Sequence, residues 1–291
     1  MKFKFIKLCT TCVLLLVSVF SFAQKDFQGK AYYQSKTTMD MSRWTGGRQM
    51  NEQQKKQMED RMKSWLEKTY VLTFTKEESM YVEDEKLEAP VGGRGPSVWG
   101  SSFSAGPQYK NVKTKLYIQD QEFFGKQFLI KEEMKPLEWI MGTETKQIGK
   151  YTCFKATATK PSTEINWSRN NRTNNNDAAK AKDSTKNDTA NTKGEEEEEM
   201  IEVIAWYTPM IPINQGPSEY WGLPGLILEV SAGNTIMLCS KIIMNPDEKT
   251  EIEAPNKGTV VTKQEYNKII SEKMEEMRNN RGRQGGGRTG L

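Results

Sequence analysis

Apolar and polar residues alternate with a period of two over much of this chain, which predicts a protein built mainly of β-strands. The alternation is clearest in residues 70–75 and 80–83, which flank four polar residues and predict a hairpin. The same pattern predicts strands in residues 27–39, 113–119, 121–129, 137–141, 151–159, 201–207, 226–230 and 235–243. Because most of these strands follow one another closely, we expect antiparallel pairing.

Two segments change to the period of a helix. In residues 51–68, apolar residues recur at spacings of three and four on a charged background: Met58, Met62, Trp65 and Leu66. We expect this stripe to pack on the sheet. Near the C-terminus, Thr262 and Glu265 have the spacing of a capping box, and apolar residues follow at helical period. Together the patterns predict an α+β fold, a mainly antiparallel sheet with two or three packed helices.

The two ends and one internal stretch depart from these patterns. Residues 1–23 combine lysines, a short apolar run and small residues before Gln24, as in a cleaved secretory signal. Residues 161–199 are polar and acidic and have almost no apolar side chain, so we expect a disordered insertion. We also expect a disordered Arg/Gly tail over residues 279–291. Residues 24–278 then form one interrupted domain, with no transmembrane segment in the mature chain.

The charge balance and the amino-acid types exclude several classes of function. The first 23 residues contain three lysines and no acid, so the mature chain has 39 basic and 38 acidic residues. This balance gives no electrostatic reason to expect nucleic acid as a partner. The chain contains no histidine, which excludes Ser-His-Asp and Cys-His catalysis and histidine-ligated zinc. We therefore expect no catalytic constellation, no cofactor and no metal.

Two cysteines, Cys153 and Cys239, remain after the signal is removed. An exported protein can form disulfides, so these residues are either bonded to each other or two buried thiols on separate strands.

Proline and glycine dominate the stretch between two of the predicted strands, around Gly222-Leu223-Pro224-Gly225-Leu226-Ile227. Leu223-Pro224-Gly225 suits a type II turn, with Pro224 first and Gly225 second. Trp206, Tyr220 and Trp221 supply large side chains on either side. The hexapeptide lacks the residues of a phosphate-binding loop. It is therefore either a corner that defines the fold or a ligand contact.

The hexapeptide and its flanks resemble the GLPGLI family of exported Gram-negative bacterial proteins, whose function is uncharacterised. The strand Gly149-Lys150-Tyr151-Thr152-Cys153-Phe154-Lys155-Ala156 resembles a second feature of that family. The resemblance implies export to the periplasm or the outer membrane. By analogy with periplasmic lipoprotein carriers, we expect the sheet to be curved into a half-barrel.

These observations favour a non-enzymatic binding or carrier module of the cell envelope for an apolar ligand or peptide. The expected contact residues are Trp206, Tyr220, Trp221, Leu223, Pro224, Trp99 and Phe103. An accessory protein that docks onto an outer-membrane assembly through its Pro-rich segment or a sheet edge is the alternative. A third hypothesis is a glycosidase that uses Glu219 and Glu229 as a carboxylate pair.

Overall fold

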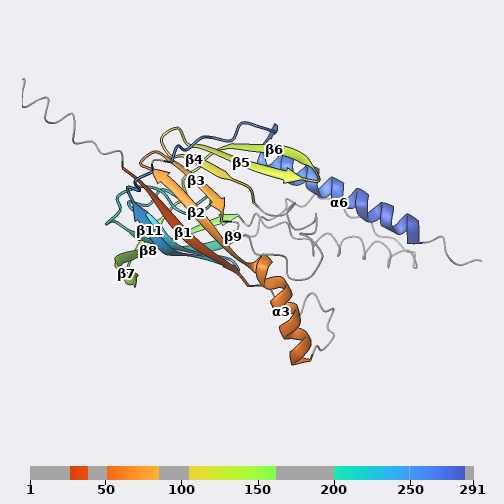
Figure 1. The fold of residues 1–291 in the computed structure, drawn as a ribbon, viewed down its shortest axis with the longest axis horizontal. Coiled ribbons are helices and arrows are strands. Elements are labelled where there is room, and N and C mark those ends of the chain that lie inside the picture. The colour runs from red at the N-terminus through yellow and green to blue at the C-terminus, as the bar shows by residue number, and fades with distance from the viewer. Residues whose placement is uncertain (1–26, 39–50, 85–104, 162–199, 249, 286–291) are drawn as a thin grey trace, which may run out of the picture.

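A computed structural model describes residues 27–38, 51–84, 105–161, 200–248 and 250–285 of the chain (Figure 1). In this part of the chain, twelve strands form one sheet in the order β12-β6-β5-β4-β3-β2-β1-β11-β10-β9-β8-β7. The strands are β1 Gln28–Thr37, β2 Glu67–Thr75, β3 Glu78–Glu83, β4 Gln108–Asn111, β5 Leu116–Phe123, β6 Lys126–Glu133, β7 Ile140–Ile148, β8 Tyr151–Pro161, β9 Met200–Thr208, β10 Leu226–Ala232, β11 Thr235–Met244 and β12 Thr259–Val261.

The pairing is antiparallel at every step except between β12 and β6, which run parallel. This confirms the prediction of a β-rich, mainly antiparallel fold. β12 has only three residues, too few for an alternating pattern, and the sequence analysis missed it. It also missed β4, a strand of four residues in a stretch where no strand was predicted.

The predicted strand over residues 121–129 was wrong in its boundaries. The chain turns back at Phe124 and Gly125, whose φ angles are 49° and 73°. Apolar residues occur on both sides of this turn, Phe123 before it and Phe128 after it, and a single strand was therefore predicted through it. β5 and β6 consequently pair as a hairpin in which Phe123 lies opposite Lys126.

Two helices lie in the described residues, α3 Glu52–Leu66 and α6 Lys263–Gly285. The predicted capping box of α6 is present, because the Thr262 backbone N–H donates to Glu265 Oε2 at 2.8 Å and the Glu265 N–H donates to Thr262 Oγ1 at 3.2 Å. α6 continues to Gly285, beyond Asn279, where the tail was expected to begin. In the part of the chain that the structure describes, neither helix is long and apolar enough to cross a membrane.

The two helices relate differently to the sheet. α6 packs its first turns on β6 and β12, with Tyr266 and Ile270 buried against Phe128 and Val261. α3 instead projects away from the sheet (Figure 1), contrary to the expectation that it packs along it. Among the residues of its predicted stripe, only Leu66 has a described side chain, which is half-buried.

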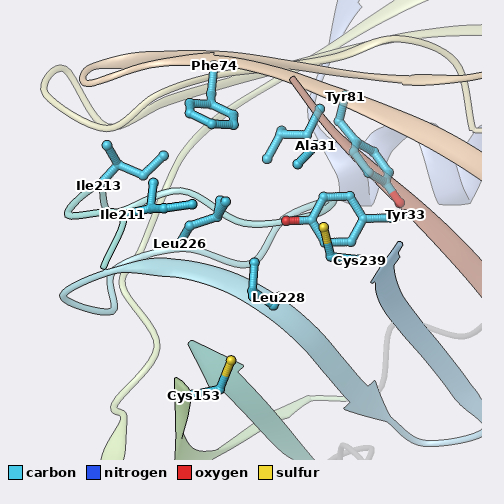
Figure 2. Close-up of a cluster of buried hydrophobic side chains, with 11 residues drawn as sticks. Ala31, Tyr33, Phe74, Tyr81, Cys153, Ile211, Ile213, Leu226, Leu228 and Cys239 are labelled. Carbon is cyan, nitrogen blue, oxygen red and sulfur yellow. The ribbon is translucent and has the colours of Figure 1, made fainter. Parts of the chain in front are cut away.

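Alternation along the strands defines an inner face of the sheet, which carries Tyr33, Met237 and Ala205. Residues 209–225, which join β9 to β10 and are called here the connecting segment, contribute to the core on this face. Figure 2 shows Ile211 and Ile213 of the segment lying beside Leu226 and facing Phe74. Tyr220 and Leu223 enter a second buried cluster with Val203 and other inner-face residues.

Each glycine of the hexapeptide has a different physical role. Gly222 has a φ of 95°, a conformation that favours glycine. Gly225 does not have the positive φ that a type II turn requires at its second central residue, so the predicted type II turn is wrong. The Gly225 N–H instead donates to Leu223 O at 2.8 Å, a tighter three-residue turn. A Cβ added to Gly225 would lie 2.2 Å from Thr208 O, so only glycine lets these two backbones approach.

Cys153 and Cys239 are both buried free thiols, so the structure contains no disulfide between them. Cys153 lies on β8 and Cys239 on β11, with β9 and β10 between these strands. Three inter-strand steps of about 4.8 Å exceed the Cα separation of roughly 7 Å that a disulfide can span. Burial raises the pKa of the Cys153 thiol to about 11 and that of Cys239 to about 12, so both stay protonated.

We expect Gly225→Ala to destabilise the protein by about 3 kcal/mol or more, because its Cβ would force β9 and the connecting segment apart. Gly222→Ala is the matched control. The nearest atom to its Cβ is 3.8 Å away, so only the unfavourable φ should cost stability, about 1–2 kcal/mol. Urea unfolding of both variants measures the difference, and equal losses would contradict the steric explanation.

Candidate functional site

A pocket of about 150 Å³ lies between the inner face of four strands and the connecting segment. The sheet provides an apolar wall of Ile201, Ala232 and Met237, together with Lys160 and the hydroxyl of Thr235. The connecting segment provides Ser218, Glu219 and Tyr220 on the other side. The pocket lining is therefore amphipathic.

Glu219 is held by two lysines from distant parts of the chain. Lys160 of β8 donates to Glu219 Oε1, and Lys263 at the start of α6 donates to Glu219 Oε2 at 3.3 Å. The Lys160 side chain is only 12% exposed, and its ammonium lies 4.9 Å from the centre of the Tyr220 ring. These contacts fix the position of the Glu219 carboxylate in the lining of the pocket.

The protonation states follow from these contacts. Burial by itself raises the pKa of the Glu219 carboxyl, but the ammonium groups of Lys263 and Lys160 outweigh it and hold the pKa at about 2. Burial lowers the pKa of Lys160, and the attraction of Glu219 outweighs it, so the pKa ends above its ordinary value. Both groups are therefore charged at neutral pH.

Lys110 is a fully buried lysine on β4 whose side chain hydrogen-bonds to the connecting segment. Its ammonium donates to Gly216 O at 2.5 Å and to Tyr220 O at 3.2 Å. Burial lowers the pKa of Lys110 to about 7, against the opposing attraction of Glu219. The two carbonyls belong to the turn that presents Ser218 and Glu219, so Lys110 sets the position of that wall of the pocket.

Other hydrogen bonds fix the rest of the connecting segment. Ser79 of β3 donates to the fully buried Gln215 Oε1 at 2.8 Å, and the Trp139 indole N–H donates to Trp221 O at 2.9 Å. The Tyr33 hydroxyl donates to Ile227 O at 2.6 Å, just beyond the segment. Side chains from several strands thus satisfy backbone and side-chain groups that a segment without regular structure leaves unpaired.

The structure separates the residues that the sequence analysis grouped as ligand contacts. Tyr220 lines the pocket, but Trp221 and Leu223 are buried in the core, and Pro224 is exposed. Trp206 lies on the opposite face of the sheet, where Lys146 sits 4.9 Å from its ring centre. Trp99 and Phe103 lie outside the described residues.

Glu219 and Glu229 belong to separate ion pairs. Glu229 is paired in register with Leu238, which alternates with the inner-face Met237, so its side chain lies on the outer face. There it accepts from Lys146 at 2.5 Å. The two carboxylates therefore do not face each other across a common cleft. Within the described residues, no group of three or more acids and cysteines could hold a metal ion.

Sequence reasoning missed the three lysines that define the site, Lys110, Lys160 and Lys263. Lys160 and Lys263 lie at a strand end and at a helix start, where a charged residue is ordinary. Lys110 lies in Gln108-Tyr109-Lys110, a stretch in which no strand was predicted. Their convergence depends on contacts between residues far apart in sequence.

We expect acid to destabilise the protein partly through Glu219. Its pKa is about 2 when folded and 4.5 as a free group, so its contribution is complete above about pH 4.5 and is lost as pH falls toward 2. Glu219→Gln should cost about 1–2 kcal/mol at pH 7, since water reaches part of the side chain, and less than half of that at pH 3. Urea unfolding between pH 3 and pH 7 measures this.

The matched control is Glu144→Gln, which removes an exposed carboxylate that pairs with Lys155 at 2.7 Å. This change should cost less than about 0.5 kcal/mol at any pH. A Glu219→Gln loss that is equal at pH 3 and pH 7 would contradict the assigned role of the two lysines.

Comparisons with known proteins give a family similarity without a function. Residues 139–229 match the family described as "Protein of unknown function (Porph_ging)", a stretch that contains both Gly149–Ala156 and the hexapeptide. No curated protein sequence matches the chain.

Two crystal structures of PNGF-II are similar to this chain in shape. The one in space group C2 has 12% identity and a TM-score of 0.43, and covers 84% of this chain and 32% of that chain. The one in space group P21 has 11% identity and a TM-score of 0.39, and covers 81% of this chain and 31% of that chain. This chain thus spans about a third of PNGF-II, and similarity this low supports no conclusion about fold or function. The chain is similar over residues 139–229, about a third of its length, to a family of unknown function.

Proposed function

We propose that the chain is an exported, non-enzymatic binding module of the cell envelope, of the GLPGLI type, that holds an apolar group of a peptide or small ligand in the pocket beside Glu219. The observation that carries the proposal is the amphipathic lining of that pocket, in which Ile201, Ala232 and Met237 lie together with the charged groups of Lys160 and Glu219. Such a pocket combines apolar contact area with a few polar groups that fix orientation.

The size of the pocket limits what it can hold. Pockets that enclose whole drug-sized ligands measure about 300–1,000 Å³, whereas an apolar cavity of about 150 Å³ holds a single benzene ring. At about 150 Å³, the pocket fits one side chain or one end of a larger ligand. This supports a peptide or a small apolar ligand over an enclosed lipid chain.

The walls of the pocket are preorganised for binding. Its apolar residues lie on paired strands, and Lys110 and Lys160 hold the opposite wall in place. A preformed site loses little conformational entropy when it binds. We include the expected half-barrel in this proposal. Glu219 pairs with Lys160 of β8 and Lys263 of α6, elements toward opposite ends of the strand order, and a sheet must curve to bring such elements together.

We expect Ala232→Leu to abolish binding, because the larger side chain would occupy the pocket. The probes are acetylated tripeptides ending in Val, Leu or Phe, each prepared with a free and with an amidated C-terminus, and native mass spectrometry reports binding. Ser231→Leu is the matched control. Ser231 pairs with Ile236 on the outer face, so the new leucine adds similar bulk away from the pocket. Wild-type protein that binds neither form, or binding unchanged in Ala232→Leu, would reject the proposed function.

The alternative, docking onto an envelope assembly, is favoured by a separate observation. Most residues of the connecting segment, one of the two expected docking surfaces, are buried or half-buried, although Pro209, Met210 and Pro212 are exposed. The other expected surface was a sheet edge, and β7 ends the strand order and pairs only with β8 in the described residues. Its Ile140 and Met141 side chains are 71% and 52% exposed. An edge strand with exposed apolar residues is a common docking surface for an extended partner segment.

A photo-crosslinking residue at Ile140 should capture a reproducible envelope protein in intact cells, if docking takes place at β7. The same residue at Ile236, a position that is 47% exposed on the interior strand β11, is the control. Equal labelling at both positions, or no product at Ile140, would reject docking through β7.

A further inference from the structure

We infer that Lys160 of the pocket binds a carboxylate. The ligand would then be a carboxylic acid with a small apolar tail, such as the C-terminal residue of a peptide. The inference rests on the proposed function and names the chemical class of its ligand. It depends on the charges, the hydrogen-bond donors and the apolar wall of the pocket.

The charges around the pocket leave an excess of positive charge. Lys160 and Lys263 share the single carboxylate of Glu219. Glu132, the acid on the neighbouring β6, accepts from the Lys263 backbone N–H at 3.1 Å. Lys110 carries a further ammonium when protonated, and both of its bonds go to carbonyls. With Lys110 protonated, three lysines stand against the two acids Glu219 and Glu132, and one more carboxylate beside Lys160 would balance them.

The pocket also offers hydrogen-bond donors to a ligand. An ammonium has three N–H donors, of which Lys160 directs one to Glu219 and a second to the Tyr220 hydroxyl. Both Glu219 oxygens accept from lysines, so a cationic ligand would meet the charges of two ammonium groups there. The hydroxyl of Ser218 adds a further donor to the same wall. A ligand that only accepts hydrogen bonds, as a carboxylate does, is complementary to this set.

The low exposure of Lys160 strengthens its attraction for an anion. Its side chain is 12% exposed, and an ion pair in a partly desolvated site is screened less than one at the surface. The sheet residues on the same wall, Ile201, Ala232 and Met237, favour an apolar tail. The volume of about 150 Å³ limits this tail to roughly the size of one side chain.

The test compares acetyl-Ala-Ala-Leu as the free acid with the same peptide as its C-terminal amide, by calorimetry on the purified protein. We expect the free acid to bind at least tenfold more tightly. Lys160→Met, which keeps the length of the side chain and removes its charge, should abolish this preference. Lys155→Met, on the outer face of the same strand, should retain it.

The outcomes separate the two proposals. Equal binding of acid and amide in wild-type protein overturns the carboxylate inference and leaves the proposed function in place. Binding of neither form overturns both. A third probe, 3-methylbutanoate, identifies the source of the carboxylate. Competition by this acid supports a free small acid as the ligand, and binding of the peptide acid without such competition supports a peptide C-terminus.

Discussion

The buried ammonium of Lys110 is the interaction on which the inner side of this protein depends. A connecting segment without strand or helix lies against the inner face of the sheet, so its carbonyls need donors that no backbone ladder supplies. Lys110 provides two of these bonds, to Gly216 and Tyr220. Replacing a buried lysine with an apolar residue would leave both carbonyls without their donor, at a cost of about 1–3 kcal/mol each.

Glu219 has a different role, since it connects parts of the chain that the sheet keeps apart. β8 lies one strand from one end of the strand order, and α6 packs on β6 and β12 at the other end. The carboxylate of Glu219 bonds to a lysine from each. Partly buried charges are seldom the most stabilising way to join two elements. Glu219 and Lys160 also line the pocket, which connects this ion-pair cluster with the binding role proposed above.

The hexapeptide Gly222–Ile227 has a structural role that differs from a ligand contact. Leu223, Leu226 and Ile227 are fully buried, and Gly225 allows the backbone to pass Thr208. The hexapeptide thus fixes the end of the connecting segment in the core. The residues of the connecting segment that line the pocket, Ser218 to Tyr220, come just before the hexapeptide in the chain. The core packing of the hexapeptide therefore holds the neighbouring pocket wall in position, although the hexapeptide itself does not line the pocket.

The sequence by itself determined the local structure of this protein: most strands, both described helices, the capping box of α6 and the need for glycine near Leu223. These features depend on side-chain period and on residues close in sequence, so they are visible in a single chain. Only the tertiary structure decided the strand order, the separation of Cys153 from Cys239 and the meeting of Lys110, Lys160 and Lys263 around one turn. Strand order and ion pairs join residues far apart in sequence, and no local pattern records which of many lysines will meet one glutamate.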